Sequence, residues 1–177
     1  AMVLVAFAFS KEFLPATHPD NTLSNTLAGT SAADATDLHF INVGQGDAEL
    51  IVCGEDAVLI DGGKASAGST LVDYLSRQGI AELDAVIATH PHEDHIEGVL
   101  TVVEKLKVKE VIISENVENT ELADKLIRLC QKRNTKILKV SKGDTFFVNG
   151  IEFSVLHPSK KEISSNLNNM SLLIKME

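Results

Sequence analysis

Tryptophan is absent from this chain of 177 residues, and aromatic residues make up only 5% of it, so the core must be built mainly from valine, isoleucine and leucine. Cysteine is also scarce. Cys53 and Cys130 are too few for a disulfide framework, and they lack the clustered spacing of a zinc–thiolate site. We expect both to be buried free thiols, with Cys53 ending a strand and Cys130 on the apolar side of a helix.

Positive charge is in the minority, with 16 lysine and arginine residues against 25 aspartate and glutamate residues and a formal net charge of -9. This balance opposes long-range attraction to a nucleic-acid backbone. A nucleic-acid partner would have to be held by local lysines, or by bound metal ions that reverse the sign of the local charge.

The sequence also lacks an apolar run long enough to span a bilayer, because the N-terminal run covers only residues 2–9. No basic residues precede it, as they would in a secretory signal. We interpret residues 1–15 as a leader stub or a segment next to a tag, residues 16–37 as a polar linker, and residues 38–177 as the domain. This layout predicts an extracellular or surface-tethered protein, with a cytoplasmic location left open.

Apolar periodicity predicts a strand meander followed by alternating strands and helices. Strands are expected at residues 38–43, 48–53, 57–60, 83–88, 108–113, 136–140, 146–148, 151–156 and 172–176. Helices are expected around residues 71–75, from about 97 to 105 and from 120 to 132. The predicted class is α/β (α+β layered), a mixed sheet with helices on its outer face. A chain of this length offers little to cover the other face.

Metal-binding chemistry is concentrated in the string His-Pro-His-Glu-Asp-His at residues 90–95, which holds three of the six histidines. Imidazole nitrogen and carboxylate oxygen are the ligands that zinc prefers. A strand that delivers His90 and His92 would point both the same way. Asp94 and His95, on the turn that follows, can face a second cation. The alternative is a polar loop with chance histidines, but their density favours a site for one or two ions of zinc or manganese.

Three strings resemble the metallo-β-lactamase superfamily: Phe-Ile-Asn-Val-Gly-Gln-Gly-Asp-Ala at residues 40–48, Leu-Ile-Asp-Gly-Gly at 59–63, and residues 83–98 with their His-x-His-x-Asp-His pattern. The first is similar to the ComEC-like branch, whose members include the extracellular domain of bacterial DNA-uptake proteins. The resemblance implies a metallo-β-lactamase αβ/βα sandwich. We expect largely its N-terminal half, because the Gly-Asp motif and the further histidine that follow in the superfamily cannot be placed here.

By this resemblance, His90 and His92 would bind a first metal ion, while Asp94 and His95 would bind a second. Asp94 is also the candidate catalytic residue. The string departs from the branch at Glu97, where a glycine is usual, and this adds a carboxylate beside the site.

Three further residues have roles that the resemblance leaves open. Asp61 would orient a metal-bound histidine without touching the ion, as such histidines normally require, or it is simply a turn residue. Asp47 is given the same role, or it closes the turn after Gly-Gln-Gly. His157 is the only histidine after His95 and so the candidate for a third histidine ligand. However, the Leu-His-Pro string around it commonly lies at the surface in this branch, or behind the metal ligands without touching the ion.

The implied function is metal-dependent hydrolysis of a phosphodiester, with DNA as the substrate by analogy with the branch. The alternative is a catalytically incomplete metal-binding fragment that self-associates through an exposed apolar sheet face. Hydrolysis of β-lactams is disfavoured, because the ComEC-like strings point to a different branch.

Overall fold

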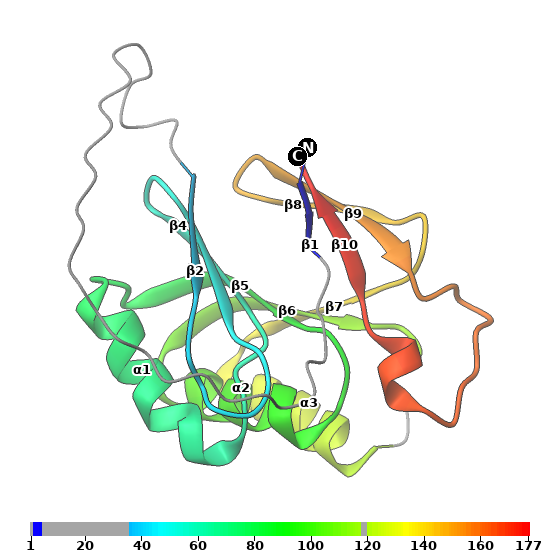
Figure 1. Ribbon diagram of the computed structural model, residues 1–177, viewed down its shortest axis with the longest axis horizontal. Coiled ribbons are helices and arrows are strands. Elements are labelled where there is room, and N and C mark those ends of the chain that lie inside the picture. The colour runs from blue at the N-terminus through cyan, green and yellow to red at the C-terminus, as the bar shows by residue number, and fades with distance from the viewer. Residues whose placement is uncertain (1, 5–35, 118–119) are drawn as a thin grey trace, which may run out of the picture.

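The computed structural model describes residues 2–4, 36–117 and 120–177 (Figure 1). Most of the predicted leader and linker therefore lies outside the described residues, and the domain boundaries stay a prediction. Within the described part, no helix is long and apolar enough to cross a membrane.

The larger sheet contains six strands in the order β2-β3-β4-β5-β6-β7. An antiparallel meander forms one half, made of β2 (Thr36–Phe40), β3 (Glu49–Cys53) and β4 (Asp56–Ile60). The other half is parallel to β4 and contains β5 (Glu82–Ala88), β6 (Lys107–Ser114) and β7 (Lys136–Val140). The sheet is therefore mixed, as predicted.

Three helices provide the crossovers that parallel strands require. They are α1 (Gly68–Arg77), α2 (Glu93–Lys105) and α3 (Glu121–Arg133), and they lie on the same face of the large sheet (Figure 1). Their buried side chains, such as Leu75, Val99 and Leu126, form one core with the sheet residues that face the helices, including Leu59 and Val86. Helical coverage of this face was also expected from the sequence.

A second sheet covers the opposite face of the large sheet, in the order β1-β10-β9-β8. Its strands are β1 (Met2–Leu4), β8 (Thr145–Val148), β9 (Ile151–His157) and β10 (Leu173–Met176). The β8–β9 hairpin turns at Asn149 and Gly150, both with the positive φ that such a tight turn needs. This hairpin confirms the sequence prediction.

The predicted exposure of the inner sheet face is wrong. Ile87 and Ile112 of the large sheet are fully buried in one cluster with Phe146, Phe153 and Ile174 of the second sheet. Three short strands with alternating apolar residues are enough to cover this face. The argument for self-association through an exposed sheet face therefore no longer holds, and self-association itself stays an untested prediction.

The metal-binding string is also placed differently from expectation. Strand β5 ends at Ala88, so His90 and His92 lie in the connection after it rather than on the strand. Helix α2 begins at Glu93, not near residue 97, which puts Asp94 and His95 on its first turn. An acidic first turn is favourable at a helix N-terminus, but its polar residues interrupt the apolar periodicity that predicted the helix.

Both cysteines are free thiols, as expected. Cys130 is buried, whereas Cys53 is only half-buried. Burial raises the pKa of the Cys130 thiol to about 11, so this side chain is an inert part of the core rather than a reactive group.

Candidate metal centre

The centre lies where β4 and β5 end side by side. These strands are parallel neighbours, so the residues that follow them meet at one edge of the sheet. Asp61 comes directly after β4, and its backbone N–H donates to the carbonyl of Ile87 across 2.9 Å. Thr89 follows β5, and its carbonyl accepts from Leu172 just before β10. The centre therefore forms at the junction of the two sheets.

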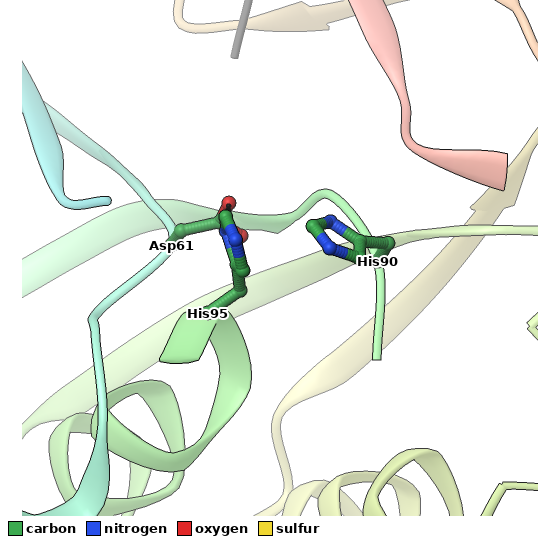
Figure 2. A group of neighbouring side chains, drawn as sticks. All are labelled: Asp61, His90 and His95. Carbon is green, nitrogen blue, oxygen red and sulfur yellow. Dashed lines mark hydrogen bonds and ion pairs between the residues drawn. The ribbon is translucent and has the colours of Figure 1, made fainter. Parts of the chain in front are cut away.

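Asp61, His90 and His95 form the inner part of the centre. Each offers a ligand atom, and these atoms all lie within 4.8 Å of one another. Figure 2 shows Asp61 and His95 next to each other, with the His90 ring turned toward them. All three are buried, and Asp61 is completely inaccessible. Segments 28 or more residues apart in the chain thus converge on one small volume.

A chain of hydrogen bonds sets the tautomers of the two buried histidines. The carboxylate of Asp61 can only accept, so Nδ1 of His95 donates to its Oδ2 across 2.8 Å. The Thr89 hydroxyl donates to the same oxygen across 2.6 Å, and can then accept from Nδ1 of His90 at 3.0 Å. Both histidines therefore keep Nε2 free of a proton. Asp61 also accepts from the Thr89 backbone N–H, which leaves its carboxylate little capacity to bind an ion directly.

His90 and His92 present a matched pair of nitrogens. Nε2 of His90 lies 3.1 Å from Nδ1 of His92. Two nitrogen ligands of one tetrahedral zinc ion, each about 2.0–2.1 Å from it, lie about 3.3 Å apart. Burial, together with the nearby His95, lowers the pKa of His90 to about 4, so the ring is neutral near pH 7 as a ligand must be. The donor set fits a divalent ion.

Asp94 and His95 form a second pair on the first turn of α2. Oδ1 of Asp94 lies 4.0 Å from Nε2 of His95, the nitrogen that the hydrogen bond to Asp61 leaves free. Oδ2 of Asp94 accepts from the Gln45 side chain at 3.3 Å. Burial alone would raise the pKa of Asp94, but a backbone hydrogen bond and the neighbouring His95 outweigh it and lower the pKa.

Asp47 lies at the edge of the same group, with Oδ2 3.9 Å from Nδ1 of His95. Burial is the main reason that the pKa of Asp47 is raised. For His95, burial works against the charged form. The hydrogen bond to Asp61 and the negative charges of Asp61, Asp47 and Asp94 outweigh that effect and raise the pKa of His95.

Close backbone contacts explain the glycines on either side of the centre. A side chain at Gly98 of α2 would collide with the carbonyl of Gly62, and Gly62 itself donates to the carbonyl of His95 across 2.9 Å. Gly46, with φ +103°, lies against the backbone of Asp94 in the same way. These contacts let the Gln-Gly-Asp turn and the Asp-Gly-Gly turn approach the start of α2.

The structure brings together six of the seven predicted residues: Asp47, Asp61, His90, His92, Asp94 and His95. His157 is not among them. Its Nε2 donates to the carbonyl of Asn169 at 2.8 Å, and its Nδ1 lies 3.5 Å from the Glu162 carboxylate. Both ring nitrogens of His157 therefore have partners in the loop before β10, away from the candidate metal centre.

Sequence reasoning missed the roles of Thr89 and Glu49, whereas for Asn168 it offered two interpretations, a residue that lines the same cavity or an ordinary residue before a strand. Thr89 links Asp61 to His90, and the Asn168 side chain hydrogen-bonds to His90 from the loop before β10. Oε2 of Glu49 is buried without a hydrogen-bond partner in the described part of the chain. Burial and nearby Asp61 raise the pKa of Glu49 to about 7. Its position at the start of a predicted strand, two residues after Asp47, was the one available signal.

Residues 41–134 match the family model described as the metallo-β-lactamase superfamily. This chain belongs to the metallo-β-lactamase superfamily. Over 159 residues it is 29% identical to ComE operon protein 3 of Bacillus subtilis (strain 168), which confirms the predicted ComEC-like resemblance. The match covers 80% of this chain and 20% of that protein, so the chain spans about a fifth of the length of the curated relative it matches.

Solved structures agree on the fold. A B3 metallo-β-lactamase with an active-site glutamic acid is 15% identical with a TM-score of 0.54, and the match covers 82% of this chain and 55% of that one. The metallo-β-lactamase of Cronobacter sakazakii with an HARLDQ motif is also 15% identical, with a TM-score of 0.51 over 67% of this chain and 49% of that one. The superfamily fold is therefore confirmed, while substrate and activity have to be argued from the site.

Proposed function

We propose that this chain carries the metal-binding residues of the active site of a metal-dependent phosphodiesterase. The observation that supports the proposal best is the 3.1 Å separation of the two ring nitrogens of His90 and His92, next to the second pair formed by Asp94 and His95. Each pair would hold one divalent ion, zinc or manganese. Asp61 and Asp47 would act on His95 without contacting an ion.

The chemistry that such ions supply is a water activated near neutral pH and a neutralised phosphate oxygen. The residues of the chain have separate tasks. Asp61 holds the proton of His95 on Nδ1. The Thr89 hydroxyl donates to Asp61 and accepts from Nδ1 of His90, so it holds the proton of His90 on Nδ1 as well. Gln45 holds one oxygen of Asp94 and leaves the other near His95. Asp94 is the proposed catalytic residue, because its carboxylate lies at the open side of the centre.

DNA is the proposed substrate on two grounds. The Val-Gly-Gln-Gly-Asp-Ala string at residues 43–48 resembles the branch that includes DNA-uptake proteins, and the 29% identity to ComE operon protein 3 supports that assignment. A phosphodiester also carries the negative charge that a divalent ion stabilises. An extracellular or surface-tethered location is part of the same proposal and rests on the apolar and polar segments that precede residue 38.

The test measures metal content and turnover on the same samples. After dialysis against zinc or manganese, the metal content is determined by elemental analysis, and hydrolysis is followed with bis(p-nitrophenyl) phosphate and with labelled single-stranded DNA. We expect metal retention and turnover in the unaltered chain and in His157→Ala, and loss of both in His92→Ala. Turnover that persists in His92→Ala would contradict the proposal.

The alternative, a metal-binding fragment without catalysis, is supported by the small number of donors. Within the described residues the two pairs provide four ligands, and the nearby Asp61 carboxylate already accepts three hydrogen bonds. Metal retained in the unaltered chain and lost in His92→Ala, with no hydrolysis of either substrate, would favour this reading.

A further inference from the structure

A groove of about 370 Å³ opens beside the candidate metal centre. Gln45 and Lys64 line one part of it, and residues 91–94 and Leu122 line the rest. His92 and Asp94 belong both to this groove and to the metal centre. A substrate longer than the group being cleaved can therefore extend from the centre into the groove. The volume is within the range of sites that bind small organic ligands.

Lys64 is the one cation among the residues that line the groove. In the part of the chain that the structure describes, no hydrogen bond or ion pair occupies its ammonium group. Some lysines elsewhere are paired: Lys109 contacts Asp84 at 2.6 Å, and Lys160 contacts Glu115 at 3.1 Å. Glu93 and Asp94 line the same groove, so in a protein with a net charge of -9 the Lys64 ammonium group is the local attraction there for an anion.

The backbone that carries Lys64 is held firmly from both sides. Lys64 is extended, with φ -71° and ψ 164°, at the start of the short 3-10 helix η2 (Ala65–Ala67). The next residue, Ala65, donates its N–H to the Glu97 carboxylate on α2 at 3.1 Å. Gly63, the residue before, donates to the carbonyl of Asp47 and accepts from Gly98. The ammonium group is thus presented from a fixed turn. Glu97, where the ComEC-like branch usually has a glycine, therefore helps to hold the turn that carries Lys64.

The groove also offers apolar contacts, because Pro91 and Leu122 are among the residues that line it. We propose that the groove binds the nucleotide unit next to the cleaved phosphodiester, with Lys64 paired to its phosphate and with Pro91 and Leu122 against its sugar or base. This inference rests on the proposed phosphodiesterase function. Lysine suits the phosphate as a compact point charge, and the apolar residues suit the uncharged part of the same unit.

The experiment compares Lys64→Gln with Lys132→Gln, an exposed lysine at the end of α3 whose replacement changes the net charge equally. Binding of a labelled DNA tetranucleotide to the metal-loaded proteins is measured by fluorescence anisotropy at several salt concentrations. We expect Lys64→Gln to weaken binding about 5- to 10-fold and to reduce the slope of log affinity against log salt by about 0.7, the value for one phosphate contact on a single strand. Lys132→Gln should bind like the unaltered protein.

A second substrate separates this groove from the centre itself. Bis(p-nitrophenyl) phosphate has no neighbouring phosphate, so Lys64→Gln should lower kcat/KM for the tetranucleotide by a larger factor than for this small substrate. NMR signals of the Leu122 methyl groups should shift when the tetranucleotide is added. Equal oligonucleotide binding in Lys64→Gln and the unaltered protein, or no binding to either, would overturn the inference.

Failure of this inference and failure of the proposed function give different results. If the oligonucleotide binds through Lys64 but is never cleaved, the proposed hydrolase function is wrong and the proposed nucleotide-binding groove is retained. If the oligonucleotide is cleaved and Lys64→Gln binds it as tightly as the unaltered protein, the proposed groove is wrong and the proposed hydrolase function is retained. Circular dichroism and thermal melting of both variants show whether the fold is retained, and Leu122→Ala provides an independent change in the same groove.

Discussion

His95 donates from Nδ1 to Oδ2 of Asp61 across 2.8 Å, and this one hydrogen bond determines which nitrogen of His95 faces the candidate metal centre. Asp61 is completely buried between the ends of two parallel strands and can only accept. The free nitrogen, Nε2, therefore points toward Asp94 at 4.0 Å. Such a carboxylate fixes the tautomer and the ring orientation of the histidine that it holds, and its loss typically weakens metal binding.

Replacement of Asp61 by asparagine tests this relationship. The amide keeps the shape of the side chain but has one acceptor oxygen where the carboxylate has two. The three donors, which are Nδ1 of His95 and the N–H and O–H of Thr89, therefore cannot all keep their hydrogen bonds. We expect zinc affinity to fall about 10- to 100-fold. Calorimetric titration measures it, and Asp73→Asn on the exposed side of α1 is the matched control. Unchanged zinc affinity in Asp61→Asn would show that His95 does not depend on this carboxylate.

Thr89 should matter through its hydroxyl group alone. Thr89→Val keeps the branched shape in a buried position but removes the link between Asp61 and His90, whereas Thr89→Ser keeps the link. We expect the valine variant to lose about 10-fold in zinc affinity and the serine variant to stay close to the original. In nitrogen-15 spectra of the metal-free protein, the His90 ring should shift toward the other tautomer only in Thr89→Val. Equal behaviour of the two variants would contradict a role for the hydroxyl.

Gly98→Ala should damage both the fold and the site. The added methyl group would meet the carbonyl of Gly62, and that contact joins the Asp61 turn to helix α2. Neither backbone segment can move without moving Asp61 or His95. We expect the free energy of unfolding to fall by about 1–3 kcal/mol, as for other over-packed interiors. Urea denaturation measures it, with Glu104→Ala at an exposed position of the same helix as control. A midpoint equal to that of the control would argue against the close contact.

The sequence predicted the parts of the molecule that depend on local pattern. The ligand string at residues 90–95, the β8–β9 hairpin and the mixed sheet each leave a signal within a few adjacent residues. The start of α2 was misplaced because Glu93 and Asp94 are stabilised by the helix N-terminus and not by burial. The link from Thr89 to Asp61 could not be predicted, because it depends on the pairing of strands whose contacting residues are 28 positions apart.

Long-range packing accounts for the error about the inner sheet face. Phe146 and Phe153 stack with their rings 5.1 Å apart and 9° from parallel, and they cover part of the large sheet although their strands have only four and seven residues. Chain length alone suggested that such a cover was missing. The number of apolar residues that face inward from β8, β9 and β10 was the better guide, and it becomes visible only once the hairpin is placed over the sheet.

Asp84 ties together three strands at the end of the sheet away from the candidate metal centre, and it should make stability depend on pH. Its carboxylate accepts from Ala57 at 2.9 Å, from Lys109 at 2.6 Å and from Asn149 of the β8–β9 hairpin at 2.7 Å. Burial alone would raise the pKa of Asp84, but these three hydrogen bonds outweigh it and hold the pKa below its ordinary value.

A lowered pKa stabilises the fold at pH values above the ordinary aspartate pKa of about 3.9, and that contribution is lost as the pH falls through the folded-state pKa. Asp84→Asn should therefore lower the free energy of unfolding by about 1.5–3 kcal/mol at pH 7, the typical contribution of hydrogen bonds to a charged group. The difference from the unaltered protein should shrink as the pH falls toward 3. Urea denaturation at both pH values measures it, and Asp73→Asn should show no such convergence. A difference that stays constant with pH would mean that Asp84 acts through its shape and not through its charge.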